Sequence, residues 1–199
     1  MTHKIKQIKS EQEIDNAIDF SRKIFGENFA GLGSREAQKE MLLKIMSHDS
    51  DLLLYAESNN IMVGIAFGGI EEDGNMVVKV LAVDESFRGS GIAHEMMLML
   101  EERAKTHNVS VIALGAVETG EEFYAKLGYT GSLLIQSEKH SIDELLAINT
   151  KYPVNYTRVH DETIQQVNLA ISAPDRDLQQ KYETNLPGCY TQMMFWKNI

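Results

Sequence analysis

The chain has 199 residues, of which 43% are hydrophobic and 24% charged, a composition typical of a soluble globular domain with its own hydrophobic core. No stretch approaches the roughly 18 consecutive apolar residues of a membrane-spanning helix, so we expect no membrane partner. Nineteen basic and 29 acidic residues give a formal net charge of −10. Because an acidic surface repels nucleic acid and attracts cations, we expect no nucleic-acid partner and regard a cationic amine substrate as plausible, although the charge also serves solubility.

The first part of the sequence changes between strand and helical periodicity. Residues 3–9 alternate between apolar and polar side chains, as in a half-buried strand. Ser10 and Glu13 have the spacing of a capping box, which satisfies the first free amides of a helix. Asn-Asn and Asp-Gly turns separate the apolar runs that follow. The predicted elements are a strand at 3–9, a helix after Ser10, a helix at 35–46 capped by Ser34, and a hairpin of 51–57 with 61–69.

The central part contains the most regular patterns. Residues 76–83 are nearly all apolar and β-branched, which favours a strand buried on both faces. Residues 92–107 have apolar side chains at four-residue spacing, which predicts an amphipathic helix. A capping box at residues 119–122 predicts a short helix that ends at Gly128. Further strands are predicted at 109–115 and 129–136.

This order of elements predicts an α/β (α+β) fold with a mixed, mainly antiparallel central sheet flanked by helices. It differs from the regular alternation of strand and helix in a doubly wound fold. We expect residues 1–136 to form this domain.

Residues 137–199 are predicted to form a small C-terminal extension with a βαβ-like pattern. Ser141 begins a short helix, and two alternating runs can pair around residues 160–162. A helix from Pro174 and a final strand at 189–196 follow. The apolar cluster 193–196 indicates either core packing or an interface, so a homodimer formed through the extension is one hypothesis.

The segment Arg88-Gly89-Ser90-Gly91-Ile92-Ala93 lies between the predicted buried strand and the long helix. Backbone amides in such a loop, and at the N-terminus of the following helix, point at one place and carry partial positive charge. They form an anion site, and glycines let a pyrophosphate approach the backbone. Arg88 adds a fixed positive charge beside it.

Three phosphate-binding patterns compete for this segment. The Rossmann fingerprint needs a third glycine at the position of His94, and the P-loop needs a Gly-Lys-Ser/Thr ending that is absent. The third pattern, [R/Q]-x-x-G-x-[G/A] after a strand ending in Leu-Ala-Val-Asp, fits at every defined position. We therefore favour the third pattern.

Residues 81–84 followed by 87–93 resemble the acyl-CoA pyrophosphate loop of the GNAT acyltransferases. Residues 122–129, EFYAKLGY, are similar to the F-Y-x-K-L-G-[FY] segment of that family, and the interval of roughly 30 residues between the two motifs also matches. The resemblance covers about residues 4–136 and leaves the extension unexplained. One position departs from it: Val117 stands where many relatives have an asparagine that helps to bind CoA, so that contact is missing or supplied otherwise.

The resemblance implies acetyl-CoA as the co-substrate and a role for each motif. The backbone amides of Gly89, Ser90, Gly91, Ile92 and Ala93 would hold the pyrophosphate. The backbone of Leu81, Ala82 and Val83 would pair with the pantetheine arm, and an amide near Val83 would polarise the thioester carbonyl. Tyr124 would act as the general acid that protonates the departing CoA thiolate.

The sequence does not assign the general base. An amine with a pKa near ~10 must lose a proton before it attacks the thioester. Glu71, Glu72 and Asp73 occupy the turn before the buried strand, and Glu118 follows the strand at 109–115. Glu118 is a weak candidate for the base, and a water relay would also serve.

We therefore interpret the chain as an acetyl-CoA-dependent N-acetyltransferase that acts on a small-molecule or peptide amine by direct attack. A non-catalytic acyl-CoA-binding sensor and an interaction module on the same fold are the alternatives. The six histidines show no metal-ligand spacing, so we expect no metal. We expect the single cysteine, Cys189, to be buried. The absence of disulfides and of a signal-peptide pattern favours a cytoplasmic location.

Overall fold

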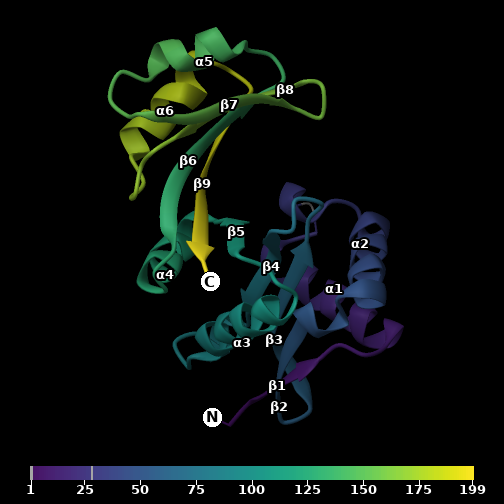
Figure 1. The fold of residues 1–199 in the computed structure, drawn as a ribbon. Coiled ribbons are helices and arrows are strands. Elements are labelled where there is room, and N and C mark those ends of the chain that lie inside the picture. The colour runs from purple at the N-terminus through teal and green to yellow at the C-terminus, as the bar shows by residue number, and fades with distance from the viewer. Residues whose placement is uncertain (1, 28) are drawn as a thin grey trace. The chain divides into compact units, whose positions relative to one another are not determined.

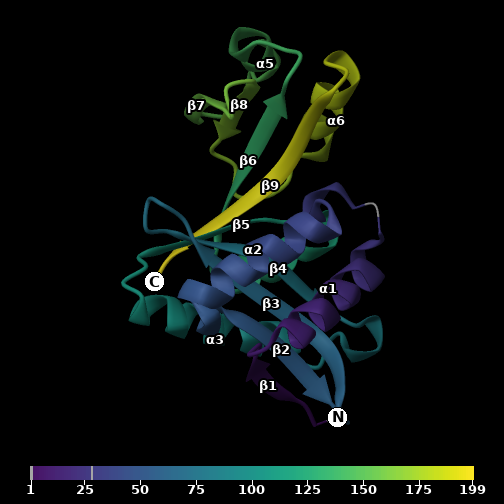
Figure 2. The ribbon, with the colours of Figure 1, turned by 90° about the vertical axis from the view of Figure 1, so that its right-hand side faces the viewer.

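The computed structural model describes residues 2–27 and 29–199 (Figures 1 and 2). These residues form two compact units, which are described separately. The first unit contains the chain up to Ile112, together with Asn198 and Ile199, and the second unit contains Ala113–Lys197. The strand β5 (Val111–Gly115) contains the point at which one unit passes into the other.

The first unit is an antiparallel sheet with helices on both faces (Figure 1). Side chains from α1 and α2 pack in one cluster with Leu53, Ile65 and Ala82 from the sheet. Helix α3 packs on the other face, over Gly64. In sheet order the strands are β1 (Lys4–Gln7), β2 (Leu53–Ser58), β3 (Ile61–Ile70) and β4 (Met76–Val83), and the helices are α1 (Glu11–Phe25), α2 (Arg35–His48) and α3 (Ile92–Thr106).

The second unit is a sheet in which β9 lies beside β6, with β5 next to β9 and β8 and β7 beyond β6. Strand β6 pairs antiparallel with both β8 and β9, so β8 and β9 are parallel to each other. Helix α6 connects them, which confirms the predicted βαβ-like pattern. In sheet order the strands are β5, β9 (Cys189–Asn198), β6 (Thr130–Ser137), β8 (Ile164–Leu169) and β7 (Val154–His160), and the helices are α4 (Glu121–Lys126), α5 (Ile142–Ile148) and α6 (Arg176–Asn185).

The predicted fold class is confirmed: a mixed, mainly antiparallel sheet flanked by helices. Ser10, Ser34 and Ser141 cap their helices as predicted. Two local predictions are wrong. Residues Glu118–Gly120 form a 3₁₀ turn that places Thr119 inside the turn, so α4 begins after Gly120 without a side-chain cap. Strand β4 is buried on one face only, because its side chains alternate between buried and half-buried positions.

Candidate functional site

The end of β4 is fixed by the neighbouring strand and by the turn that follows it. Val83 and Ala82 lie opposite Gly64 and Ile65 of β3. The amide of Asp84 then donates to the carbonyl of Val63 at 2.9 Å. Leu81, Ala82 and Val83 thus stand in regular strand geometry at the end of β4.

Asp84 organises the turn after β4. Its carboxylate accepts hydrogen bonds from the hydroxyl and the amide of Ser86, at 2.6 and 3.1 Å, and it forms an ion pair with Lys23 at 2.9 Å. The hydrogen bond from the Ser86 hydroxyl, followed by that from Lys23, lowers the pKa of Asp84 to about 2. The carboxylate is therefore ionised at neutral pH and holds the short 3₁₀ turn Glu85–Phe87.

The predicted pyrophosphate loop has the backbone that its glycines permit. Gly89 and Gly91 have φ angles of 76° and 87°, a region that other residues rarely adopt. Gly91 is the N-cap of α3, and as a glycine it has no side chain that could accept from the first amides of that helix. A Cβ at either glycine would meet no atom within 4 Å, so the space beside the loop is open. Exposed amides, open space and the exposed Arg88 together fit a pyrophosphate.

Gly64 determines how closely α3 approaches the sheet. A Cβ at this position would lie 3.1 Å from side-chain atoms of both Ile92 and Met96 and 3.3 Å from the carbonyl oxygen of Ala82. A side chain at this position would therefore crowd the first two turns of α3, and glycine lets the helix pack closely against β3. Gly64 is not among the residues predicted from the sequence, although a glycine within an apolar strand often indicates a close approach of this kind.

Tyr124 lies in the second unit, on α4, in an aromatic cluster. Its ring centroid is 5.1 Å from that of Phe123, 5.7 Å from that of Phe195 and 6.1 Å from that of Tyr129. The residue is 8% exposed, and this burial raises the pKa of Tyr124 to about 12. The phenol therefore keeps its proton throughout the neutral and moderately alkaline range.

Glu118 is engaged by a partner that sequence analysis did not identify. Its carboxylate lies 3.3 Å from Nε of Arg176, the first residue of α6, and its side chain is 75% exposed. The same guanidinium lies 2.5 Å from the carboxylate of Glu121, whose side chain is only 7% exposed. A carboxylate shared with a guanidinium has fewer lone pairs available to accept a proton from an amine.

The other candidate bases are in the turn between β3 and β4. Glu71 forms an ion pair with Lys79, and Asp73 accepts hydrogen bonds from the amide and the side chain of Asn75. The amide of Asn75 is the main cause of the lowered pKa of Asp73. These two side chains are thus occupied with local contacts.

The remaining expectations concern metals, membranes and the cysteine. Within residues 2–27 and 29–199, no group of three or more His, Cys, Asp or Glu side chains could hold a metal ion. In the same residues no helix has the length and apolar character needed to cross a membrane. Cys189 is buried as expected, and burial raises the pKa of its thiol to about 11, so it is protonated at neutral pH.

The structure thus assembles the loop residues Arg88 to Ala93 with the end of β4 in the first unit, and it places Tyr124 and Glu118 in the second unit. A strand that ends in a glycine loop before the N-terminus of a long helix can hold an anion such as a pyrophosphate. The family model described as an acetyltransferase (GNAT) domain matches residues 9–142. The chain belongs to this family.

Solved structures share the fold. PaiA N-acetyltransferase from Thermoplasma acidophilum, in complex with coenzyme A, is 16% identical, with 86% of this chain and 100% of that chain covered and a TM-score of 0.52. An acetyltransferase from Streptococcus agalactiae 2603 is 17% identical, with coverages of 85% and 98% and a TM-score of 0.52. AAC(6')-Iy, in complex with the bisubstrate analogue CoA-S-monomethyl-acetylneamine, is 13% identical, with coverages of 64% and 90% and a TM-score of 0.53. At these identities the likeness establishes the fold.

Proposed function

We propose that the protein transfers an acetyl group from acetyl-CoA to a primary amine of a small molecule or peptide. The observation that carries this proposal is the loop from Arg88 to Ala93, with two glycines of positive φ before an uncapped helix of 15 residues. Such a loop supplies several amides and a positive helix end to one anion. The membership in the acetyltransferase family and the fold of a relative solved with coenzyme A support the same assignment.

The proposed reaction is a direct transfer without an acyl-enzyme. The amine nitrogen attacks the thioester carbonyl, the C–S bond breaks, and the nitrogen releases its proton to water or a carboxylate, for which Glu118 is the weak candidate. The amide groups near Val83 stabilise the negative charge on the carbonyl oxygen. No step is assigned to Cys189, since its thiol is buried and protonated.

Tyr124 is proposed to give its proton to the departing thiolate. With a pKa of about 12, the phenol is protonated when the thiolate leaves, but it is a weaker acid than an exposed phenol. A free thiol has a pKa of about 8.5, well below the pKa of Tyr124 in the unliganded protein. With these two values, proton transfer from the phenol to the thiolate is uphill by several kcal/mol, at ~1.4 kcal/mol per pKa unit. The role therefore requires that the departing thiolate be desolvated beside the phenol, which would raise the proton affinity of the thiolate.

Calorimetric titration with acetyl-CoA tests the cofactor site. Gly91→Glu places an anion in the open space beside the loop and should abolish binding. Gly74→Glu is the matched control, since Gly74 also has a positive φ of 79° with no atom within 4 Å of a Cβ, but lies in the turn before β4. Equal binding by the wild type and Gly74→Glu, with none by Gly91→Glu, is the expected result. Absence of binding by the wild type would refute the assignment.

A screen of primary amines then tests catalysis. Release of free CoA in the presence of an amine, with an acetylated product detected by mass spectrometry, is expected of the enzyme. A protein that binds acetyl-CoA but acetylates none of the amines, and in which Tyr124→Phe leaves every property unchanged, would instead be the non-catalytic sensor. Truncation near residue 136 does not single out the interaction module, because it also removes β8 and β9, which pair with β6, and Phe195, which contacts Tyr124. The location in the cytoplasm and a dimer formed through residues 137–199 stay predictions.

A further inference from the structure

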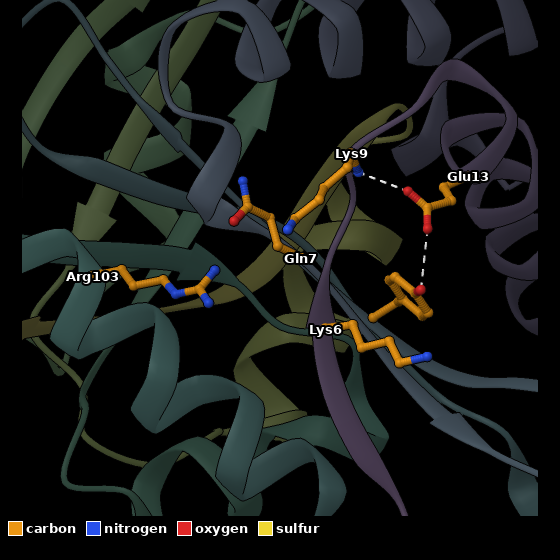
Figure 3. Close-up of a pocket in the computed structure, with 6 residues that line it drawn as sticks. Lys6, Gln7, Lys9, Glu13 and Arg103 are labelled. Carbon is orange, nitrogen blue, oxygen red and sulfur yellow. Dashed lines mark hydrogen bonds between the residues drawn. The ribbon is translucent and has the colours of Figure 1, made fainter.

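A cavity of about 380 Å³ lies in the first unit, beside β1 (Figure 3). It is bordered by β1, the start of α1, β2 and the last turns of α3. Arg103 stands three turns beyond Ile92, roughly 16 Å along the helix at 1.5 Å per residue, so the cavity is separate from the loop that precedes α3. Its lining side chains are Lys6, Gln7, Lys9, Glu13, Tyr55 and Arg103.

The lining is cationic although the chain carries a net charge of −10. It contains three basic side chains and one acidic side chain. Lys6 already has a partner, because its ammonium lies 2.5 Å from the carboxylate of Glu57. Among the residues that the structure describes, Lys9 and Arg103 form no ion pair; Arg103 donates instead to the carbonyl oxygen of Asp51.

The one carboxylate in the lining is occupied by other groups. Glu13 accepts hydrogen bonds from the amide of Lys9 at 2.7 Å, from the hydroxyl of Tyr55 at 3.1 Å and from the hydroxyl of Ser10 at 3.3 Å. Burial opposes the ionisation of Glu13, but these hydrogen bonds outweigh it and lower the pKa of the carboxyl. Its oxygens are therefore occupied by Lys9 and Ser10, just before α1, and by Tyr55 of β2. Among the described residues, the ammonium of Lys9 has no carboxylate partner.

The unpaired cations lie on one side of β1. In Figure 3 the side chains of Gln7 and Lys9 extend to the same side of the strand as the guanidinium of Arg103, whereas Lys6 extends to the other side. The strand register agrees with this view. Lys6 and Gln7 are adjacent in β1, opposite Tyr55 and Leu54 of β2, so their side chains point to opposite faces of the sheet. The side-chain amide of Gln7 donates to Ser50 at 3.0 Å and has a second N–H.

We propose that this cavity binds a small oxyanion, a carboxylate or phosphate group, between Arg103 and Lys9. The guanidinium is held in place by the carbonyl of Asp51, and it retains N–H groups in a planar fork that fits two oxygens of one anion. Lys9 supplies a point charge, and Gln7 a neutral donor. This proposal is independent of the acetyltransferase assignment, since none of its residues belongs to the loop at Arg88 to Ala93.

The test is a titration of the full chain, followed by NMR amide shifts, with sodium phosphate and sodium acetate as separate probes. Sodium chloride at matched ionic strength controls for screening. The titration is made in the Gly91→Glu background, so that the glycine loop cannot take the anion. Saturable shifts around Lys9 and Arg103 with phosphate, acetate or both are expected, and they identify which oxyanion the cavity accepts.

Matched variants locate the site. Lys9→Gln removes an exposed ammonium and should weaken the response at least several-fold, and Arg103→Gln should do the same. Lys4→Gln, which removes an exposed cation from β1 but outside the lining, should leave the response unchanged. If Arg103→Gln does not fold, Lys9→Gln decides alone. Shifts equal to those with chloride, or a response unchanged in Lys9→Gln, would overturn the proposal.

Discussion

Arg176 provides the sharpest test of how the C-terminal part of the chain supports α4. Its guanidinium compensates the carboxylate of Glu121, which is 7% exposed and lies 2.5 Å away. Arg176→Ala leaves that carboxylate without its cation. Removing one partner of a buried ion pair costs about 3–5 kcal/mol. Because Arg176 itself is 42% exposed, water can enter in its place, so we expect a loss of about 2 kcal/mol.

Urea unfolding followed by circular dichroism measures this loss. In a chain of this size, 2 kcal/mol corresponds to a fall in melting temperature of about 4–8 °C. Glu118→Gln is the matched control, because its side chain is 75% exposed and also contacts Arg176; it should cost less than about 0.5 kcal/mol. The double variant Arg176→Ala with Glu121→Gln should recover much of the loss, since it removes the uncompensated charge.

A loss below about 0.5 kcal/mol for Arg176→Ala would refute the reasoning, because surface substitutions usually change stability by no more than that. An equal loss for Glu118→Gln would also refute it. Arg176 holds the helix that carries Tyr124, so we further expect Arg176→Ala to lower kcat more than it weakens acetyl-CoA binding. An unchanged kcat in the folded variant would show that α4 keeps its position without the ion pair.

Three other predictions follow from the site. Tyr124→Phe should lower kcat by about 10² to 10⁴, the usual contribution of a general acid, with unchanged acetyl-CoA binding in calorimetry. The rate should rise with pH between 6 and 10 as the amine loses its proton, with no descending limb, since the pKa of Tyr124 is about 12; a fall in rate near pH 9 would contradict this. The pKa of Asp84 is lowered from 3.8 to about 2, so its stabilising effect is present above pH 4 and disappears as the pH falls through 2. Asp84→Asn should therefore be less stable than the wild type at pH 6, and the difference in unfolding free energy should shrink toward pH 2.

The parts of the fold that depend on local patterns could be predicted from the sequence. Strand β4 has the predicted bounds, Met76–Val83, because a run of apolar β-branched residues is itself the signal for a strand. The two glycines of the loop adopt the positive φ that makes a glycine necessary there. Helix α3 begins at Ile92 as predicted, since its apolar spacing begins there.

The parts that depend on contacts between distant residues could not be predicted. Nothing in the residues around Glu121 indicates Arg176 as its partner 55 positions later. The cationic cavity combines β1 with the end of α3, and no local pattern connects Lys9 to Arg103. The predicted capping box at Thr119 failed although its residue spacing is correct. Thr119 lies inside the 3₁₀ turn Glu118–Gly120, so its side chain is not at the start of a helix.

The pairing of β9 with β6 makes the C-terminal part of the chain a part of the unit that contains Tyr124. Cys189 to Trp196 pairs with β6 along its whole length, from Ser137 to Thr130. Phe195, which is on this strand, contacts the ring of Tyr124, so residues near the C-terminus supply part of the burial that raises the pKa of the proposed acid. The strands and helices of residues 137–199 therefore complete the compact unit that holds Tyr124. In the proposed chemistry, they exclude water from the phenol and keep it protonated until the thiolate leaves.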